Sequence, residues 1–337
     1  MRVFVAGASG ALGSRLVAQL INAGHEVIGT HNSPASAERV RKLGATPLVV
    51  DLLDARAVRK AVLASEPEAI VHQATALGGA KFGRSLDKTF AMTNRLRVEG
   101  TDRLLSAARE AGVRRVVAQS FAPYRYAREG GPVKSEDDPL DPNPPANAAE
   151  TYAAMSHLDR AVTGAGGIAL RYGGFYGGVS EGWAEPVRKR QFPIVGDGGG
   201  IMSFIHLDDA AAATVLALEH DGPAIYNIVD DEPAPARDWL PVLAEVLGAK
   251  PPRRFPAWLA RLFAGEAAVV MGTQSAAHQT PRPSASLAGR RVTPAGVRDS
   301  RPPTWRSRSR TDRRPAMPQG RAIRRPRCAL ERFWSKP

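Results

Sequence analysis

Three glycines near the N-terminus have the spacing of a dinucleotide-binding turn. Gly7, Gly10 and Gly13 form a G-x-x-G-x-x-G pattern that follows the apolar run Arg2–Ala6 and opens a helical pattern at Ala11. Such a turn lets the backbone approach a pyrophosphate closely and points the amides of a helix N-terminus at it. Because the pattern stands between a strand and a helix, it predicts an NAD(P) site rather than a tight turn without a ligand.

The end of the second predicted strand bears on the choice between NAD and NADP. An Asp or Glu at this place binds the ribose 2′-hydroxyl of NAD, but residues 29–32 include no acid. His31, Arg39 or Lys42 could meet a 2′-phosphate instead, which favours NADP, although the same side chains are nearly as typical of a solvated surface. Asp51, which ends the third strand, either binds the adenine amino group or caps the next helix.

Strand and helix patterns that alternate over the first 172 residues would position these groups. Strands of a parallel sheet are buried on both faces, so they appear as nearly continuous apolar runs between helices. The predicted strands are Arg2–Ala6, Glu26–Thr30, Thr46–Val50, Ala69–Gln73, Arg115–Gln119 and Gly167–Tyr172. The predicted helices are Ala11–Ala23, Ala35–Leu43, Ala55–Ala64, Leu86–Ala111 and Ala149–Thr163. Right-handed crossovers then give an α/β fold with a Rossmann doubly wound parallel sheet.

Three segments are predicted from these patterns. Residues 1–172 form the NAD(P)-binding Rossmann domain, and residues 173–275 form a smaller substrate-binding lobe over the carboxyl ends of the strands. Residues 276–337 form a disordered basic tail, because their composition is rich in Arg, Pro and Ser and has no period. The elements expected in the smaller lobe are a strand at Ala224–Val229 and helices near Asp208–Glu219 and Arg237–Leu247.

In this order of elements the chain resembles the extended short-chain dehydrogenase/reductase family, the NAD-dependent epimerase/dehydratase group, over about residues 1–275. The segments that carry the resemblance are Gly7/Gly10/Gly13, Asp51–Asp54, Val98–Thr101, Leu170–Gly177 and Phe204–Asp209. The resemblance implies an NAD(P)-dependent oxidoreductase or epimerase/dehydratase that acts on a nucleotide sugar or a small alcohol or carbonyl compound by hydride transfer. The cofactor contacts that we expect from motif and resemblance are Gly7, Ser9, Gly10, Leu12, Gly13, His31, Asp51, Leu52 and Ala74.

The Ser-Tyr-Lys chemistry of this family matches the chain only in part. Ser120 stands at the position of the serine that polarises the substrate oxygen, and Tyr152 at that of the tyrosine acid/base. The lysine of the family's Y-x-x-x-K motif is Ser156 here, and the asparagine of its N-V-x-G-T pattern is Arg97. His157 lies about 100° around the helix from the lysine position, which makes it a poor substitute.

Two other tyrosines are rival proton donors. Tyr124 and Tyr126 follow Ser120 in a loop, residues 124–147, that is rich in Pro, Gly and acids and long enough to be functional. Because the lysine is absent, the alternative function is an NAD(P)-binding redox-sensing or regulatory protein with little catalysis. Arg171, at the end of a strand, either meets a substrate anion or, as we favour, forms a structural ion pair.

No metal site is predicted. His206 lies close to Asp208 and Asp209, but in the family such a segment is a turn in which one of the two acids caps the following helix. The other histidines have no ligand spacing.

The charge of the chain is concentrated at one end. The formal net charge is +13, and residues 276–337 hold fifteen Arg, one Lys and three acids, so that residues 1–275 are balanced. The globular part therefore predicts no nucleic-acid partner. No apolar run reaches the roughly 18 residues of a membrane helix, and Cys328 is the sole cysteine. We expect a cytoplasmic protein with a small-molecule substrate, no membrane partner and, as one option, a homodimeric state.

The basic segment, residues 276–337, is predicted to be translated in a shifted reading frame. One permitted codon choice for Ala276–Ser300, read with one C added in front, encodes RGASNAKAKRELGWTPRYASWREGF, which resembles the C-terminus of the family. We infer that one C was lost after the codon of Ser275 and that the tail carries no function. A coding sequence incompatible with this choice of codons would refute the inference.

Overall fold

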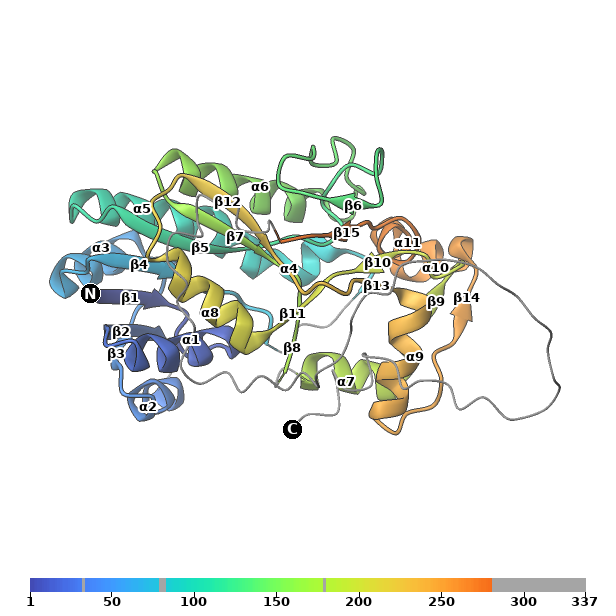
Figure 1. Ribbon diagram of the computed structural model, residues 1–337, viewed down its shortest axis with the longest axis horizontal. Coiled ribbons are helices and arrows are strands. Elements are labelled where there is room, and N and C mark those ends of the chain that lie inside the picture. The colour runs from blue at the N-terminus through green and yellow to red at the C-terminus, as the bar shows by residue number, and fades with distance from the viewer. Residues whose placement is uncertain (32–33, 79–82, 178–179, 281–337) are drawn as a thin grey trace, which may run out of the picture. The chain divides into compact units, whose positions relative to one another are not determined.

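A seven-stranded parallel sheet forms the centre of the fold (Figure 1). The computed structural model describes residues 1–31, 34–78, 83–177 and 180–280. The strand order is β12-β7-β5-β4-β1-β2-β3, with all neighbouring strands parallel, which confirms the predicted doubly wound sheet. Its strands are β1 (Arg2–Ala6), β2 (Glu26–His31), β3 (Thr46–Val49), β4 (Ala69–His72), β5 (Arg115–Phe121), β7 (Ile168–Tyr172) and β12 (Ala224–Ile228).

Helices cover both faces of this sheet (Figure 1). The helices are α1 (Ala11–Asn22), α2 (Pro34–Lys42), α3 (Ala55–Ser65), α4 (Leu86–Arg95), α5 (Thr101–Glu110), α6 (Ala149–Gly164) and α8 (Leu207–Ala217). Side chains of β1 alternate between the two faces, as the pleat of a strand requires. Val3 and Val5 belong to the core that includes α1 and α8, whereas Phe4 and Ala6 belong to the core that includes α3 and α5.

The long helix predicted over Leu86–Ala111 is interrupted. A π-helical segment, η1 (Leu96–Gly100), separates α4 from α5 and contains Arg97. A π segment adds a residue to one turn and is frequent at functional sites, but it leaves the apolar period of the sequence almost unchanged. The interruption places Arg97 in a buried position against the carboxyl ends of the strands, near Tyr124 and Arg125.

Short elements form the rest of the described chain, beyond the carboxyl ends of the strands (Figure 1). They are β6 (Val133–Lys134), β8 (Gly174–Tyr176), α7 (Ser180–Arg188), β9 (Ile194–Val195), β10 (Ile201–Met202), β11 (Phe204–His206), β13 (Ala234–Pro235), α9 (Ala236–Val246), β14 (Arg254–Phe255), α10 (Ala257–Ala264), α11 (Glu266–Thr273) and β15 (Ala277–His278). Two elements of residues 173–275 join the main layers instead, since β12 pairs with β7 and α8 packs on α1. The predicted boundary at residue 172 therefore separates two proposed functions. It does not separate two independently packed domains.

The first residues of the predicted tail are part of the fold. Ala277 and His278 are buried in β15, which pairs in parallel with β6, and the Thr280 hydroxyl donates to the Val229 carbonyl oxygen at 2.9 Å. For residues 276–280 the prediction of disorder was therefore wrong, because backbone pairing and burial hold this stretch. The rest of the predicted tail, residues 281–337, lies outside the described residues.

Candidate functional site

The glycine turn after β1 is closely packed at two of its three glycines. Gly7 has φ +89°, and a Cβ atom there would lie 2.7 Å from Ala74 Cα. A Cβ atom on Gly13 would lie 2.1 Å from the Gly7 carbonyl oxygen. Gly10 differs, because its Cβ atom would meet only the Gly7 carbonyl oxygen, at 3.3 Å, and the residue is exposed. Gly7 and Gly13 thus allow the close packing of the turn, while Gly10 leaves open space in front of it.

The helix that follows the turn presents free amides to this space. Gly10 is the N-cap of α1 and no side chain caps the helix. The first helical hydrogen bond runs from the Ser14 amide to the Gly10 carbonyl oxygen at 2.9 Å, so the amides of residues 11–13 have no partner within the helix. Free amides at a helix N-terminus behind an open glycine fit the pyrophosphate of a dinucleotide.

The remaining predicted cofactor contacts surround this turn. Ser9 is half-buried within it, and the Leu12 side chain lies in the core, so Leu12 can face a ligand only with its backbone. Leu52 is buried against the other core, and its carbonyl oxygen accepts from Arg103 Nη1 at 3.3 Å. Ala74 touches the Gly7 turn from the end of β4.

The two polar contacts predicted at the adenosine end have different surroundings. Asp51 is exposed, and its Oδ1 accepts from the Leu53 amide at 2.8 Å. The cap of α3 is Asp54, which accepts from the amides of residues 56 and 57, so Asp51 is not the cap. His31 ends β2 and is buried, and its Nδ1 has no hydrogen-bond partner among the described residues.

The open face of Gly10 allows a clean test of the cofactor motif. A valine at this position is expected to weaken NADPH binding about tenfold or more, because its side chain fills the space that a pyrophosphate needs. Fluorescence titration of NADPH measures the effect. Gly164→Val is the matched control, since nothing lies within 4 Å of a Cβ atom there. A folded Gly10→Val variant with wild-type affinity would contradict the motif assignment.

The two predicted catalytic side chains lie near the loop that follows β5. Ser120 is buried on β5, and its Oγ accepts from Arg125 Nη1 at 2.9 Å. Tyr152 is buried on α6, and its hydroxyl donates to the carbonyl oxygen of Tyr124. Burial raises the pKa of Tyr152 above its usual range, and the neighbouring Tyr124 and Asp141 raise it further. Tyr152 is therefore held in its protonated form, with its proton directed at the backbone.

The rival tyrosines differ in their partners. Tyr126 is buried, donates to Asn227 Oδ1 at 2.8 Å and accepts from Arg171 Nη1 at 2.7 Å. Tyr124 has φ +52°, and its ring lies edge-on against Phe121. Burial raises the pKa of Tyr124 to about 12, although the nearby charge of Arg97 lowers it. Neither rival is thus a ready proton donor, because Tyr126 is fixed in a network and the Tyr124 proton is held tightly.

The position of the missing lysine is occupied by a serine in contact with an arginine. Ser156 Oγ accepts from Arg125 Nη2 at 3.4 Å, and the same Nη2 lies 2.9 Å from Asp159 Oδ2. His157 is turned away, with Nε2 2.7 Å from Asp102 Oδ1. Sequence reasoning missed Arg125, and the loss of the lysine was the signal that another cation was needed.

Arginines bring positive charge to the carboxyl ends of β5 and β7. Arg171 donates from Nε to Asp159 Oδ2 at 2.9 Å, and its Nη2 forms an ion pair with the same oxygen at 2.9 Å, which is the structural ion pair favoured by the sequence. Arg97 is 9% exposed and makes no hydrogen bond or ion pair with any described residue. Burial, together with the nearby charge of Arg125, lowers the pKa of Arg97 to about 10. An arginine still holds its proton at neutral pH under these conditions.

The segment that resembled a metal cluster is a helix start. His206 is the N-cap of α8, and its Nδ1 accepts from the Asp208 amide at 3.2 Å, so the cap is the histidine and not one of the two acids. Within the described ranges, no three His, Cys, Asp or Glu side chains are arranged to hold a metal ion. In the same part of the chain, no helix is both long and apolar enough to cross a membrane.

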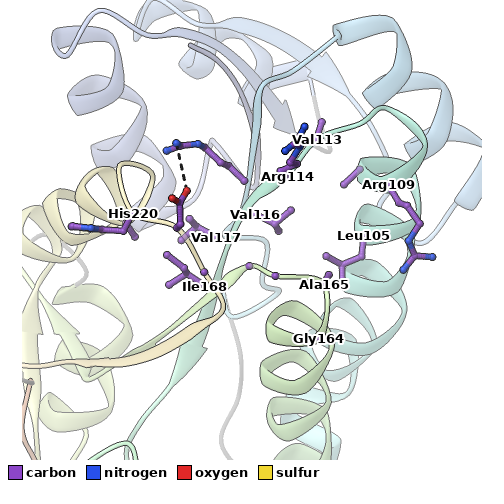
Figure 2. A pocket seen from close by; sticks show the side chains of 17 residues that line it. Leu105, Arg109, Val113, Arg114, Val116, Val117, Gly164, Ala165, Ile168 and His220 are labelled. Atoms are coloured by element: carbon purple, nitrogen blue, oxygen red, sulfur yellow. Dashed lines mark ion pairs between the residues drawn. The ribbon is translucent and has the colours of Figure 1, made fainter.

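A cavity of about 770 Å³ lies away from this site (Figure 2). Its lining includes Arg115 and Ile168, which begin β5 and β7, and an ion pair of 3.7 Å joins Arg115 to Asp221 beside it. Ligands of doubly wound folds bind at the carboxyl ends of the strands. The cavity is at the amino ends, so it is not part of the cofactor site.

Known proteins resemble this chain in sequence and in fold. The model of the NAD dependent epimerase/dehydratase family matches residues 3–229. A 3-diazoavenalumate denitrifying reductase from a Streptomyces species is 42% identical over 273 residues, or 79% of this chain and 88% of the relative. A 2-alkyl-3-oxoalkanoate reductase from Stenotrophomonas maltophilia is 29% identical over 264 residues, or 74% and 76%. The crystal structure of the Thermus thermophilus UDP-glucose 4-epimerase in complex with NAD has a TM-score of 0.62 at 25% identity, covering 86% and 92%.

Proposed function

Because the chain belongs to the NAD dependent epimerase/dehydratase family, we propose that it is an NAD(P)H-dependent reductase of aromatic diazo compounds. The observation that carries the proposal is the loss of the acid/base pair: Ser156 replaces the lysine, and the Tyr152 proton is directed at a backbone carbonyl. When bound, the cofactor supplies a hydride. The free amides at the start of α1 would bind the pyrophosphate of the cofactor, and the site would orient the acceptor beside Ser120.

The absence of a working tyrosine–lysine acid/base pair distinguishes between classes of hydride acceptor. Reduction of a carbonyl adds a hydride to carbon and a proton to oxygen, so it needs a positioned acid. An arenediazonium differs: the hydride electron pair forms the new C–H bond, the electrons of the broken C–N bond leave with dinitrogen, and no proton is added. A site without a working proton donor is therefore suited to diazo compounds. The name of the relative that is 42% identical specifies a diazo substrate and the removal of nitrogen.

Aromatic side chains next to Tyr152 support an aromatic acceptor. Phe90, Phe121 and Tyr124 are half-buried and pack on the cluster around Tyr152 and Met155. The Tyr124 ring centroid lies 5.5 Å from that of Phe121 and 6.3 Å from that of Tyr152. Such rings pack well against a planar aromatic molecule.

The test is reduction of 4-carboxybenzenediazonium by NADPH deuterated at C4. We expect NADPH consumption, release of dinitrogen and one deuterium in the aryl C–H bond of the product. Gly10→Val corrects for uncatalysed reduction. Turnover of ketones or UDP-glucose without turnover of the diazonium would overturn the proposal, and cofactor binding without any turnover would favour the redox-sensing alternative.

Replacement of Tyr152 by phenylalanine distinguishes the two chemistries. For diazonium reduction, we expect the rate of Tyr152→Phe to stay within about threefold of wild type, because no proton is transferred. A loss of 10²–10⁴-fold, the usual size for a lost general acid, would mean that Tyr152 acts as one. Tyr124→Phe, measured beside it, would show whether the acid is in the loop instead.

We further propose that NADP binds more tightly than NAD, because β2 ends on His31 without a carboxylate. His31→Asp is expected to shift the ratio of the NADPH and NADH dissociation constants towards NADH by about tenfold, since an acid repels a 2′-phosphate and binds a 2′-hydroxyl. Lys60→Asp is the control, because Lys60 is exposed on α3 and lines a hollow together with Arg2 and Glu26, the first residues of β1 and β2. An unchanged ratio in His31→Asp would contradict this role of the strand end.

A homodimer and a cytoplasmic location remain proposals. Size-exclusion chromatography with light scattering tests the first, and fractionation of cells that express the protein tests the second.

A further inference from the structure

Arg125 connects the serine of the site with the position of the missing lysine. It is 1% exposed and lies in the loop that follows β5. Its Nη1 donates to Ser120 Oγ at 2.9 Å and to the Phe121 carbonyl oxygen at 3.2 Å, and its Nη2 reaches Ser156 Oγ and Asp159 Oδ2. One guanidinium thus occupies the space between the serine of β5 and the lysine position of α6.

We propose that Arg125 is a positioning residue that replaces the lysine, and that through Ser120 it makes the site bind an oxyanion on the aromatic ring of the substrate. This inference rests on the proposed diazo reductase function. It assigns a substrate class: aryl diazo compounds whose ring carries an oxygen conjugated with the diazo group.

The direction of the hydrogen bond from Arg125 decides what Ser120 can do. A hydroxyl has one proton and two lone pairs, whereas a guanidinium has only donors. The Ser120 oxygen therefore accepts from Arg125, and the Ser120 hydroxyl donates to no described residue. Its proton is free for an acceptor outside the chain, and the charge on Arg125 strengthens Ser120 as a donor.

The charges around Ser120 favour a negative ligand. Arg125 and Arg171 share one oxygen of a single carboxylate, Asp159. Arg97 adds a third buried guanidinium, and Glu136, half-buried on the Arg171 side, adds a second carboxylate. A third carboxylate near Tyr152, Asp141, is paired with a fourth guanidinium, Arg128, at 3.1 Å, so the guanidiniums outnumber the carboxylates by one. A buried excess of positive charge is costly unless an anion uses it, and in a low dielectric it stabilises an oxyanion strongly.

A conjugated ring oxygen makes use of this arrangement. An aryl diazo compound with a conjugated ring oxygen has two resonance forms. One has a carbonyl and a neutral diazo group, and the other has a phenolate and a diazonium group. Hydrogen bonding at the oxygen favours the second form, which is the better hydride acceptor. The hydride pair then forms the C–H bond, the C–N pair leaves with dinitrogen, and the negative charge stays on the oxygen as a phenolate. Because a phenol has a pKa near 10, its phenolate is a far weaker base than an alkoxide. The product can therefore leave the site as a phenolate, without a proton from the enzyme.

The experiment compares 4-hydroxybenzenediazonium with 4-methoxybenzenediazonium, which cannot carry the negative charge. Wild type is expected to prefer the hydroxy compound in kcat/KM by about tenfold to hundredfold, the size of a charge-assisted hydrogen bond. Arg125→Gln is expected to lose the preference and keep its affinity for NADPH. Arg125→Lys should keep part of the preference, and Ser156→Lys combined with Arg125→Gln should restore part of it by returning the cation to α6. A purely structural defect would lower kcat/KM for both substrates by the same factor and leave the preference unchanged.

The outcomes separate this inference from the proposed function. If wild type reduces both compounds equally well, or if folded Arg125→Gln keeps the preference, the inference is wrong while the diazo reductase stands. If wild type reduces neither compound, the proposed function itself fails. Should Arg125→Gln not fold, Ser120→Ala decides the matter, because it removes the proposed donor and must abolish the preference.

Discussion

Ser120→Ala is expected to lower kcat for reduction of a ring-oxygenated arenediazonium by about tenfold to hundredfold, the size of the charge-assisted hydrogen bond that it removes. The expectation rests on two contacts of Ser120. Its oxygen accepts from the buried guanidinium of Arg125, and its proton is left for the substrate. Without the hydroxyl, Arg125 keeps its bonds to the Phe121 carbonyl and Asp159, so the fold is expected to persist. Single-turnover kinetics at saturating NADPH measures the chemical step directly.

Ser106→Ala is the matched control for this experiment, because Ser106 is exposed on α5. It is expected to leave the rate unchanged. A Ser120→Ala variant that binds NADPH normally and turns over within threefold of wild type would remove Ser120 from the chemistry.

The sequence was sufficient to predict six of the seven strands of the sheet, because their signals are local, whereas the seventh, β12, was assigned to the smaller lobe. The predicted strand Arg2–Ala6 has the bounds of β1, and the helix predicted over Ala55–Ala64 differs from α3 by one residue. Buried parallel strands are continuous apolar runs. The start of α3 was predicted correctly, although its N-cap is Asp54 and not Asp51, the candidate that the sequence offered. The glycine turn was recognisable for the same reason, since its three glycines lie within seven residues.

The charged part of the site could not be predicted in this way. Arg125 bonds to Ser120, Ser156 and Asp159, and the last two are on a helix that begins 24 residues after Arg125. Sequence spacing carries no information on such contacts until the fold is known. The burial of Arg97 depends likewise on the π-helical segment, and the pairing of His278 on the register of β15 against β6.

Removal of the carboxylate of Asp159 is expected to have the largest effect on stability. Asp159 is 2% exposed, and its Oδ2 bonds to both Arg125 and Arg171 at 2.9 Å. Removing one partner of a buried ion pair costs about 3–5 kcal/mol, because it leaves an uncompensated charge in a low dielectric. Asp159→Ala would leave the charges of both Arg125 and Arg171 uncompensated, and the charge of Arg97 lies nearby. We therefore expect the free energy of unfolding to fall by at least this amount.

Urea denaturation of Asp159→Ala and Asp159→Asn separates charge from packing. Asparagine fills the same volume without the charge, so the two variants should lose similar stability if electrostatics dominates, with unchanged m values. Glu110→Ala is the control, because it breaks an ion pair with Arg59 that is exposed to solvent, and its unfolding midpoint should hardly move. A loss below about 1 kcal/mol in Asp159→Asn would mean that the guanidiniums are compensated elsewhere. The excess of positive charge that favours an oxyanion beside Ser120 would then be absent, so this measurement bears on the substrate class as well as on the fold.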